Sequence, residues 1–340
     1  MNIGVMQSIL ITGASGFIGS FIVEEALQRG MTVWAGIRSS SSRRYLKHPD
    51  IRFIELDFAR PDMLKTVLES HRKEHGRFDY IVHCAGVTKC TDKQDFERVN
   101  FMQTRCFVDT LRSLDMVPQR FLFVSTLSVF GAIHEEDYAP IREEDTPCPN
   151  TAYGRSKLKA ERYLQSLNDF PYVIFRPTGV YGPRERDYYL MAQSIKRHTD
   201  VAVGYRRQDL TFVYVKDVVQ ALFLAIEKGV SRRAYFLSDG EVYSSCTFSD
   251  LIRQELGNPF VIRLKFPLFV LKIVSLLAER WARMSGKPCT LNSDKYNIMK
   301  QRNWQCDLTP VVEELGYAPR YNLERGVKET VAWYKEEGWL

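Results

Sequence analysis

Residues 8–30 read SILITGASGFIGSFIVEEALQRG, an apolar run joined to a helical segment by a glycine turn. The run "SILITG" is typical of a buried strand, and residues 17–30 have helical periodicity and end at a glycine. Between them Gly13, Gly16 and Gly19 follow the spacing GxxGxxG. We expect the first to permit a tight turn, the second to let a pyrophosphate approach the backbone, and the third to allow close packing of helix on strand. The stretch therefore predicts a dinucleotide site with phosphates at a helix N-terminus.

The same alternation continues along the chain. Further apolar, β-rich runs, separated by segments long enough for helices, cover residues 32–37, 51–56, 80–86, 121–126, 172–177 and 234–239. Strands that alternate with helices predict an α/β fold with a doubly wound parallel (Rossmann) sheet and ligands at the carboxyl ends of its strands. Residues 211–229 read as one more strand and helix. We predict a nucleotide-binding domain of residues 1–176 plus 211–239 and a smaller C-terminal substrate-binding lobe of 177–210 plus 240–340.

Composition excludes several classes of protein. The 340 residues are 45% apolar and carry a net charge of +6, with Lys and Arg spread along the chain rather than gathered in a nucleic-acid-binding tract. Seven cysteines occur without a CxxC or Cys/His ligand pattern, which favours free thiols in a reducing compartment and argues against a metal site. The first residues lack the pattern of a signal peptide, so we expect a cytoplasmic protein. From the spread of its charges we expect a small-molecule substrate and no nucleic-acid partner.

The end of the second expected strand indicates which dinucleotide binds. An NAD site has an acidic residue here for the ribose 2′-hydroxyl, but the chain reads AGIRSSSSRR, with no acid between Trp34 and Asp50. Arg38 would face a 2′-phosphate, with Ser39 and Arg43 as helpers. We therefore predict that NADP(H) is preferred and NAD(H) is the second choice. The alternative is that the arginine is a solvated loop cation.

Two tyrosine–lysine pairs have the spacing of one helical turn. Tyr153 and Lys157 lie in TAYGRSK, and Tyr296 and Lys300 lie in YNIMK. A tyrosine beside an ammonium group can be a proton donor of lowered pKa, but either pair can equally be two solvated side chains. Spacing alone does not choose between the pairs.

The order of several motifs along the chain distinguishes the two tyrosine–lysine pairs. With TGASGFIG, ELDF, VHCAG, FVSTLSVFG, AYGRSK and FRPTGVYGP in sequence, residues 7–240 resemble the extended short-chain dehydrogenases/reductases. This family includes nucleotide-sugar epimerases and dehydratases, and ketone reductases acting on flavonoids, steroids and lipids; the motif pattern is nearest to the ketone and lipid reductases. The resemblance implies a catalytic set of Thr126, Tyr153 and Lys157. In the family, the catalytic tyrosine and lysine lie on the helix that follows the fifth strand, and the end of that strand supplies the threonine. No strand of this kind precedes Tyr296 and Lys300, so we interpret this second pair as structural.

The resemblance also assigns roles. Tyr153 would be the general acid/base at the reacting oxygen, Thr126 would hydrogen-bond that oxygen, and Lys157 would hold the nicotinamide ribose and lower the tyrosine pKa. Asn100 would support the site from a helix, the alternative being a helix-surface asparagine. The residues expected at the cofactor are Gly13, Ser15, Gly16, Phe17, Ile18, Arg38, Asp57, Phe58, Ala85, Gly86, Asn100, Val124, Tyr153, Lys157, Pro177 and Val180.

Departures from the family pattern narrow the chemistry. Sugar-nucleotide 4,6-dehydratases place Asp-Glu where this chain has Leu127 and Ser128, so dehydration is not expected. Leu210 stands where an arginine would clamp a diphosphate, although Arg206 and Arg207 are near. We predict an NADPH-dependent oxidoreductase that interconverts a ketone and a secondary alcohol on an apolar substrate, such as a sterol-like or long-chain keto lipid. A nucleotide-sugar epimerase with tightly held NAD(P) is the alternative; the intact catalytic set disfavours a non-catalytic NADP(H)-binding regulator.

Residues 266–284, FPLFVLKIVSLLAERWARM, carry an apolar helical stripe but are too short and too charged to span a bilayer. The stripe comprises Phe266, Phe269, Val270, Ile273, Val274 and Leu277, widened by Leu268, Leu271 and Leu276, and flanked by Arg263, Lys265, Lys272, Arg280 and Arg283. It predicts either peripheral contact with an anionic membrane, at the inner membrane surface, or a core or dimer helix. By resemblance we also expect a homodimer through helices near 92–114 and 152–168.

Overall fold

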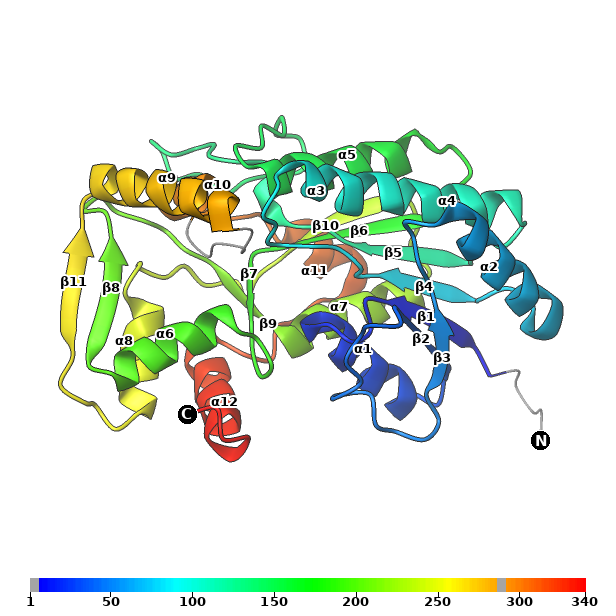
Figure 1. Cartoon of the computed structure of the whole chain (residues 1–340), viewed down its shortest axis with the longest axis horizontal. Coiled ribbons are helices and arrows are strands. Elements are labelled where there is room, and N and C mark those ends of the chain that lie inside the picture. The colour runs from blue at the N-terminus through cyan, green and yellow to red at the C-terminus, as the bar shows by residue number, and fades with distance from the viewer. Residues whose placement is uncertain (1–5, 286–291) are drawn as a thin grey trace.

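The computed structural model describes residues 6–285 and 292–340, apart from the side chains of residues 282, 283 and 285. Its centre is a seven-stranded parallel sheet in the order β10-β6-β5-β4-β1-β2-β3 (Figure 1). These strands are β1 (Ser8–Thr12), β2 (Thr32–Ile37), β3 (Arg52–Glu55), β4 (Tyr80–His83), β5 (Arg120–Val124), β6 (Tyr172–Pro177) and β10 (Arg233–Leu237). The chain order reverses beside β1, which makes its carboxyl end the switch point where ligands bind in such sheets. The predicted doubly wound fold is confirmed.

Helices cover both faces of this sheet because alternate strand residues point to opposite sides. Ile9 and Ile11 of β1 pack under α1 (Phe17–Gln28), α7 (Val215–Lys228) and α11 (Thr309–Leu315). Leu10 faces the other layer, formed by α2 (Pro61–His75), α4 (Gln103–Ser113) and α5 (Ala152–Ser166). Figure 1 shows the two layers below and above the sheet. The helix α5, which carries one of the tyrosine–lysine pairs, is thereby fixed beside the ends of β5 and β6.

A smaller lobe lies at the carboxyl ends of the strands (Figure 1). It contains α6 (Asp187–Lys196), β8 (Thr199–Val203), α8 (Thr247–Glu255), β11 (Ile262–Phe266), α9 (Leu268–Ser285), α10 (Ser293–Lys300) and α12 (Leu323–Glu336). The strand within 211–229 is β9 (Phe212–Tyr214), which pairs with β7 (Gly179–Tyr181) outside the large sheet. Strands β8 and β11 form a second parallel pair. Phe266, expected in the apolar helical stripe, is instead the last residue of β11, because the helix begins only after Pro267.

Candidate active site

The glycine turn joins β1 to α1 at the switch point. Gly13 has φ +68°, and a Cβ there would lie 2.9 Å from the backbone nitrogen of Ala85. A Cβ on Gly19 would overlap the carbonyl oxygen of Gly13. Gly16 precedes the first helical residue, and no side chain caps the first turn of α1. The turn therefore leaves backbone N–H groups available to an anion, and the residues present fit a dinucleotide pyrophosphate.

A cavity of about 710 Å³ opens beside this turn, between the strand ends and the small lobe. Most of the expected site residues line it: Gly13, Gly16, Phe17, Ile18, Gly86, Asn100, Val124, Thr126, Tyr153, Lys157, Pro177 and Val180. Five do not, namely Ser15, Arg38, Asp57, Phe58 and Ala85. The amide of Ala85 donates to Thr12 Oγ1 (3.3 Å), and Ser15 lies within the glycine turn.

The remaining three gather where β2 and β3 end. Asp57 accepts hydrogen bonds from Arg60 Nε (2.6 Å) and from the amide of Ala59 (3.0 Å). These bonds, together with the nearby charge of Arg38, lower the pKa of Asp57. The ring of Phe58 lies 5.7 Å from that of His83, at the end of β4. Arg38 is exposed, which leaves its guanidinium accessible to a ligand at this edge.

The three expected catalytic residues meet at the floor of the cavity. Thr126 follows β5, and its side chain hydrogen-bonds Tyr153 in the first turn of α5. Burial raises the pKa of Tyr153 to about 12, and the bond with Thr126 opposes that rise. The lowering by Lys157 that we expected is not among the influences on this pKa. The phenol is therefore held in its neutral, proton-donating form.

Lys157 lies one helical turn further on and is 5% exposed. Burial lowers its pKa to about 8, opposed by the charges of Glu161 and Cys84. Its Nζ lies 4.0 Å from the centre of the Phe123 ring, a cation–π contact. The lysine is thus a buried cation with little compensation in the protein alone, as suits a group that holds ligand hydroxyls.

Beneath the lysine, a buried ion pair fixes α5 on the sheet. Glu161 is fully buried and accepts from Arg176 Nε (3.0 Å) and Nη2 (2.7 Å). It also accepts from the hydroxyl of Ser125, the residue that follows β5. Because removal of one partner would leave a buried charge uncompensated, this group ties α5 to β5 and β6 in one register.

Asn100 supports the site from within the protein. It lies in a π-helical turn (Glu97–Met102) and is 1% exposed, so the surface interpretation was wrong. Its Oδ1 accepts from the amide of Val87 (2.8 Å), and its Nδ2 donates to Val87 O (3.0 Å) and to Ser156 Oγ (3.0 Å). The Ser156 hydroxyl donates in turn to Tyr153 O (2.7 Å). The loop at Gly86 and the catalytic helix are therefore connected through one amide side chain.

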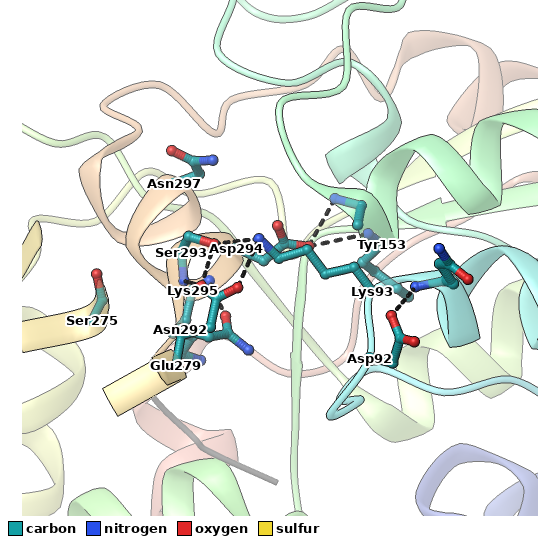
Figure 2. Close-up of polar contacts among 12 residues, drawn as sticks. Asp92, Lys93, Tyr153, Ser275, Glu279, Asn292, Ser293, Asp294, Lys295 and Asn297 are labelled. Carbon is teal, nitrogen blue, oxygen red and sulfur yellow. Dashed lines mark hydrogen bonds and ion pairs between the residues drawn. The ribbon is translucent and has the colours of Figure 1, made fainter. Parts of the chain in front are cut away.

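A residue of the small lobe adds to the N-terminal cap of the catalytic helix, whose own N-cap residue is Thr151. Asp294 on α10 accepts from the amides of Ala152 (2.7 Å) and Tyr153 (3.3 Å), as Figure 2 shows. A carboxylate at a helix N-terminus satisfies free N–H groups and interacts favourably with the helix dipole. Beside it, Asn297 Nδ2 donates to Asn150 O (2.9 Å). Asp294 thus positions the turn that carries the catalytic tyrosine, and nothing in the sequence links two residues so far apart.

Replacement of Asp294 should act on turnover through the position of Tyr153. We expect Asp294→Ala to lower kcat about 10- to 100-fold, because small misplacement of a catalytic group has costs of this size. NADPH affinity should change little, and Asp294→Asn, which keeps an acceptor oxygen, should recover most of the activity. Steady-state kinetics and cofactor titration measure these quantities.

The matched control is Asn322, whose side chain caps α12 by accepting from the amide of Arg325 (3.0 Å), away from the cavity lining. Asn322→Ala should cost about 1 kcal/mol of stability, a similar capping loss, and leave kcat unchanged. Equal kcat values for Asp294→Ala and the wild type would show that the cap is only structural.

Polar contacts hold α9 and α10 against the nucleotide-binding side. Lys93 Nζ reaches Ser293 Oγ (2.5 Å) and Glu279 Oε1 (3.1 Å), near the Asp294 cap (Figure 2). At the cavity, the carboxylate of Asp187 lies between Lys89 and Lys295, the latter at 3.5 Å. The small lobe is thereby attached around the mouth of the site.

Several lining residues escaped the sequence analysis. They come mainly from the small lobe: Glu185, Asp187, Tyr188, Leu190, Met191, Lys295 and Ile298. The regular strand–helix rhythm is lost after Pro177, so no signal placed them at the site. The second tyrosine–lysine pair is absent from the cavity lining; Lys300 Nζ instead lies 5.5 Å from the centre of the Tyr296 ring.

The model of the NAD dependent epimerase/dehydratase family matches residues 9–238. The chain belongs to this family. The expected resemblance to the extended short-chain dehydrogenases/reductases is thereby confirmed, and the chain is an enzyme of the NAD(P)-dependent type. The structural neighbours include proteins solved with NAD bound.

Family members of different activities are similar to this chain. The sterol-4-alpha-carboxylate 3-dehydrogenase (decarboxylating) of Dictyostelium discoideum is 24% identical, over 95% of this chain and 100% of that protein. The UDP-glucose 4-epimerase of Vibrio cholerae is also 24% identical, over 95% of this chain and 94% of that one. The crystal structure of UDP-glucose 4-epimerase with UDP-glucose from Thermotoga maritima superposes with a TM-score of 0.77 at 23% identity, covering 97% and 99% of the two chains. These relatives share the fold and leave the reaction to be argued from the site.

Proposed function

We propose that this enzyme interconverts a ketone and a secondary alcohol with NADP(H), on an apolar substrate such as a sterol-like or long-chain keto lipid. The observation that carries the proposal is the apolar part of the cavity lining on the small-lobe side, formed by Leu190, Met191 and Ile298. The charged groups of this lining are Glu185, Asp187 and Lys295. Among the described residues that line the cavity there is no arginine. The lining suits an apolar molecule better than a diphosphate.

The cations near the site are already engaged. Lys157 is the group expected at the nicotinamide ribose, and Lys295 faces the carboxylate of Asp187. Arg206 and Arg207 line a separate cavity, and Arg207 pairs with Asp209 through Nε (2.7 Å) and Nη2 (2.6 Å). This arrangement supports the ketone reaction over the epimerase alternative, which requires groups that bind a nucleotide diphosphate.

The position of the residues after the catalytic threonine also bears on the reaction. Leu127 is 1% exposed and packs in an apolar cluster with Val129 and Phe130, and Ser128 is 8% exposed. Neither side chain is an acid or base, so this place offers no group to remove and return protons across a sugar ring. The absence of an acid and a base at these two positions supports a reaction in which one hydride is transferred at the carbonyl carbon and one proton at its oxygen.

The chain's own residues provide the proton and the positioning. When bound, the nicotinamide cofactor supplies or accepts the hydride. Tyr153 donates its Oη proton to the carbonyl oxygen in reduction and takes it back in oxidation, and Thr126 hydrogen-bonds the same oxygen. Lys157 holds hydroxyl groups of the ligand beside the tyrosine.

A substrate screen tests the proposal. NADPH consumption should be followed with keto lipids and sterol-like ketones in one series and with UDP- and GDP-sugars in another. We expect turnover in the first series and none in the second. Turnover of a nucleotide sugar, with cofactor retained through purification, would overturn the proposal in favour of the epimerase.

The preference for NADPH is tested at Arg38. A guanidinium on a phosphate dianion contributes about 1.5–3 kcal/mol, so Arg38→Ala should lower the NADPH/NADH ratio of kcat/KM about 10- to 100-fold. Removal of an exposed cation elsewhere, Lys65→Ala on α2, should leave the ratio unchanged. An unchanged ratio in Arg38→Ala would remove this residue from the cofactor site.

A further inference from the structure

The helix α9 turns its apolar side outward. Leu277 is 63% exposed and Trp281 is 70% exposed, with Phe269 and Ile273 also exposed on the same side. The opposite side, which packs on the protein, carries Leu271 and the fully buried Ser275. A core helix would show the reverse arrangement, so the interpretation of residues 266–284 as a core helix was wrong.

Exposed apolar residues also lie on β11, the strand that precedes α9 in the chain. Leu264 and Phe266 lie two residues apart, on one face of the strand, and both are exposed. The end of β11 leads through Pro267 into the start of α9, so strand and helix meet at one end of the molecule (Figure 1). We call Leu264, Phe266, Phe269, Ile273, Leu277 and Trp281 the α9–β11 surface.

The charges around this surface are positive. Lys265, Lys272 and Arg280 are exposed on β11 and α9. Arg263 is engaged with Asp200 (2.7 Å) and with Asp250; the side chain of Arg283, another expected cation, lies outside the described residues. Glu279, the one acidic residue in the sequence of β11 and α9, bonds Ser293 Oγ (2.7 Å) and Lys93. Lysine and arginine can extend from an apolar face to anionic headgroups at its border.

The same helix adjoins the wall of the cavity. Glu279 accepts from the amide and hydroxyl of Ser293, the first residue of α10. Further along α10, Lys295 and Ile298 line the cavity and Asp294 caps the catalytic helix. The helix α9 therefore contacts α10, which forms part of the cavity wall on the substrate side.

We propose that the α9–β11 surface docks on an anionic lipid bilayer, with its apolar side chains in the interface and its cations at the headgroups. Within the described residues no helix combines the length and apolarity needed to cross a bilayer, so the contact lies at one face. The role of docking, delivery of an apolar substrate to the cavity, rests on the proposed function. Docking itself is measured without turnover.

A second copy of the chain fits the α9–β11 surface less well than an anionic bilayer does. A two-fold contact through this surface would bring Lys272 and Arg280 of both copies into one interface, while the only acidic residue of the two elements faces inward. The homodimer expected by resemblance would use α4 and α5 instead, where Arg105 pairs with Asp109 and Lys159 pairs with Glu97.

Vesicle co-sedimentation tests the docking. Wild-type protein should bind vesicles of phosphatidylcholine with phosphatidylglycerol, bind phosphatidylcholine alone at least tenfold more weakly, and lose binding as salt rises. Leu277→Glu should reduce the partition coefficient at least tenfold. The matched control is Met63→Glu on α2, another exposed apolar residue on a separate helix, which should bind as wild type. Reversal of charge in Lys272→Glu should weaken binding to the anionic vesicles alone.

Light scattering and a soluble substrate complete the test. Binding of Leu277→Glu equal to wild type, or a wild-type dimer that Leu277→Glu converts to monomer without any vesicle binding, would overturn docking. Turnover of a short, water-soluble ketone should be the same in Leu277→Glu and wild type. Vesicle binding without turnover of any ketone would refute the proposed function and leave docking supported.

Discussion

Tyr153→Phe should lower kcat by about two to four orders of magnitude, the usual contribution of a positioned general acid. The substitution removes only the hydroxyl, so the glycine turn and Lys157 remain and NADPH affinity should stay within about twofold. The hydroxyl bonds Thr126 and has a pKa near 12, so it is the protonated donor at neutral pH. Single-turnover kinetics with a saturating ketone separate this loss from any change in substrate binding.

The chain offers its own control for this result. Tyr296 has a lysine at the same spacing but is absent from the cavity lining. Tyr296→Phe should leave kcat and KM unchanged. Similar losses in the two variants would show that the place of Tyr153 after β5 does not determine its role.

Lys157→Met should abolish most turnover and at the same time stabilise the cofactor-free protein. Burial lowers the lysine pKa from 10.5 to about 8, which corresponds to a destabilisation of up to about 3 kcal/mol when the group is charged. Methionine removes the buried charge and retains contact with Phe123. Urea denaturation of the cofactor-free protein measures the gain, and the KM for NADPH should rise because ribose contacts are lost.

The contribution of Lys157 to the free energy of unfolding changes with pH. Between about pH 8 and 10.5 the folded state holds fewer protons at Lys157 than the unfolded state, so this group makes wild-type stability rise with pH. The advantage of Lys157→Met should therefore be greatest below pH 8 and fade towards pH 10.5. Lys159→Met, two residues along α5 and exposed, should show no such trend. A constant difference across this range would contradict the assignment.

The sheet and the glycine turn could be predicted because their causes are local. Ile9 and Ile11 alternate with Leu10, and Gly13 has φ +68°, a local backbone conformation that favours glycine. The expected strand 80–86 stops at His83, where the backbone leaves the sheet to form the loop beside the cavity. His83 itself bridges Thr12 Oγ1 (2.8 Å) and Thr104 Oγ1 (3.0 Å), a long-range contact that no short pattern indicates.

The rest of the site depends on tertiary contacts. The spacing of residues 266–284 gives the apolar stripe of a helix but not what lies against it, so only the structure shows that Leu277 and Trp281 face outward. The direction of the shift in the Tyr153 pKa was also missed, because burial raises this pKa and Lys157, despite its spacing, is not among the influences on it. Asp294 reaches Ala152 only through the fold, and no periodicity joins them.

The cap on α5 also sets an order of events during synthesis. The ribosome produces the N-terminal part first, and the large sheet is complete once β10 has emerged. The carboxylate that holds the first turn of α5 arrives much later, with α10. Until then the first turn of α5 has only the side chain of its own Thr151, which accepts from the amide of Gly154 (2.9 Å). Premature termination between these points would remove one of the two side chains that cap the turn bearing Tyr153, and would leave one face of the sheet without α11.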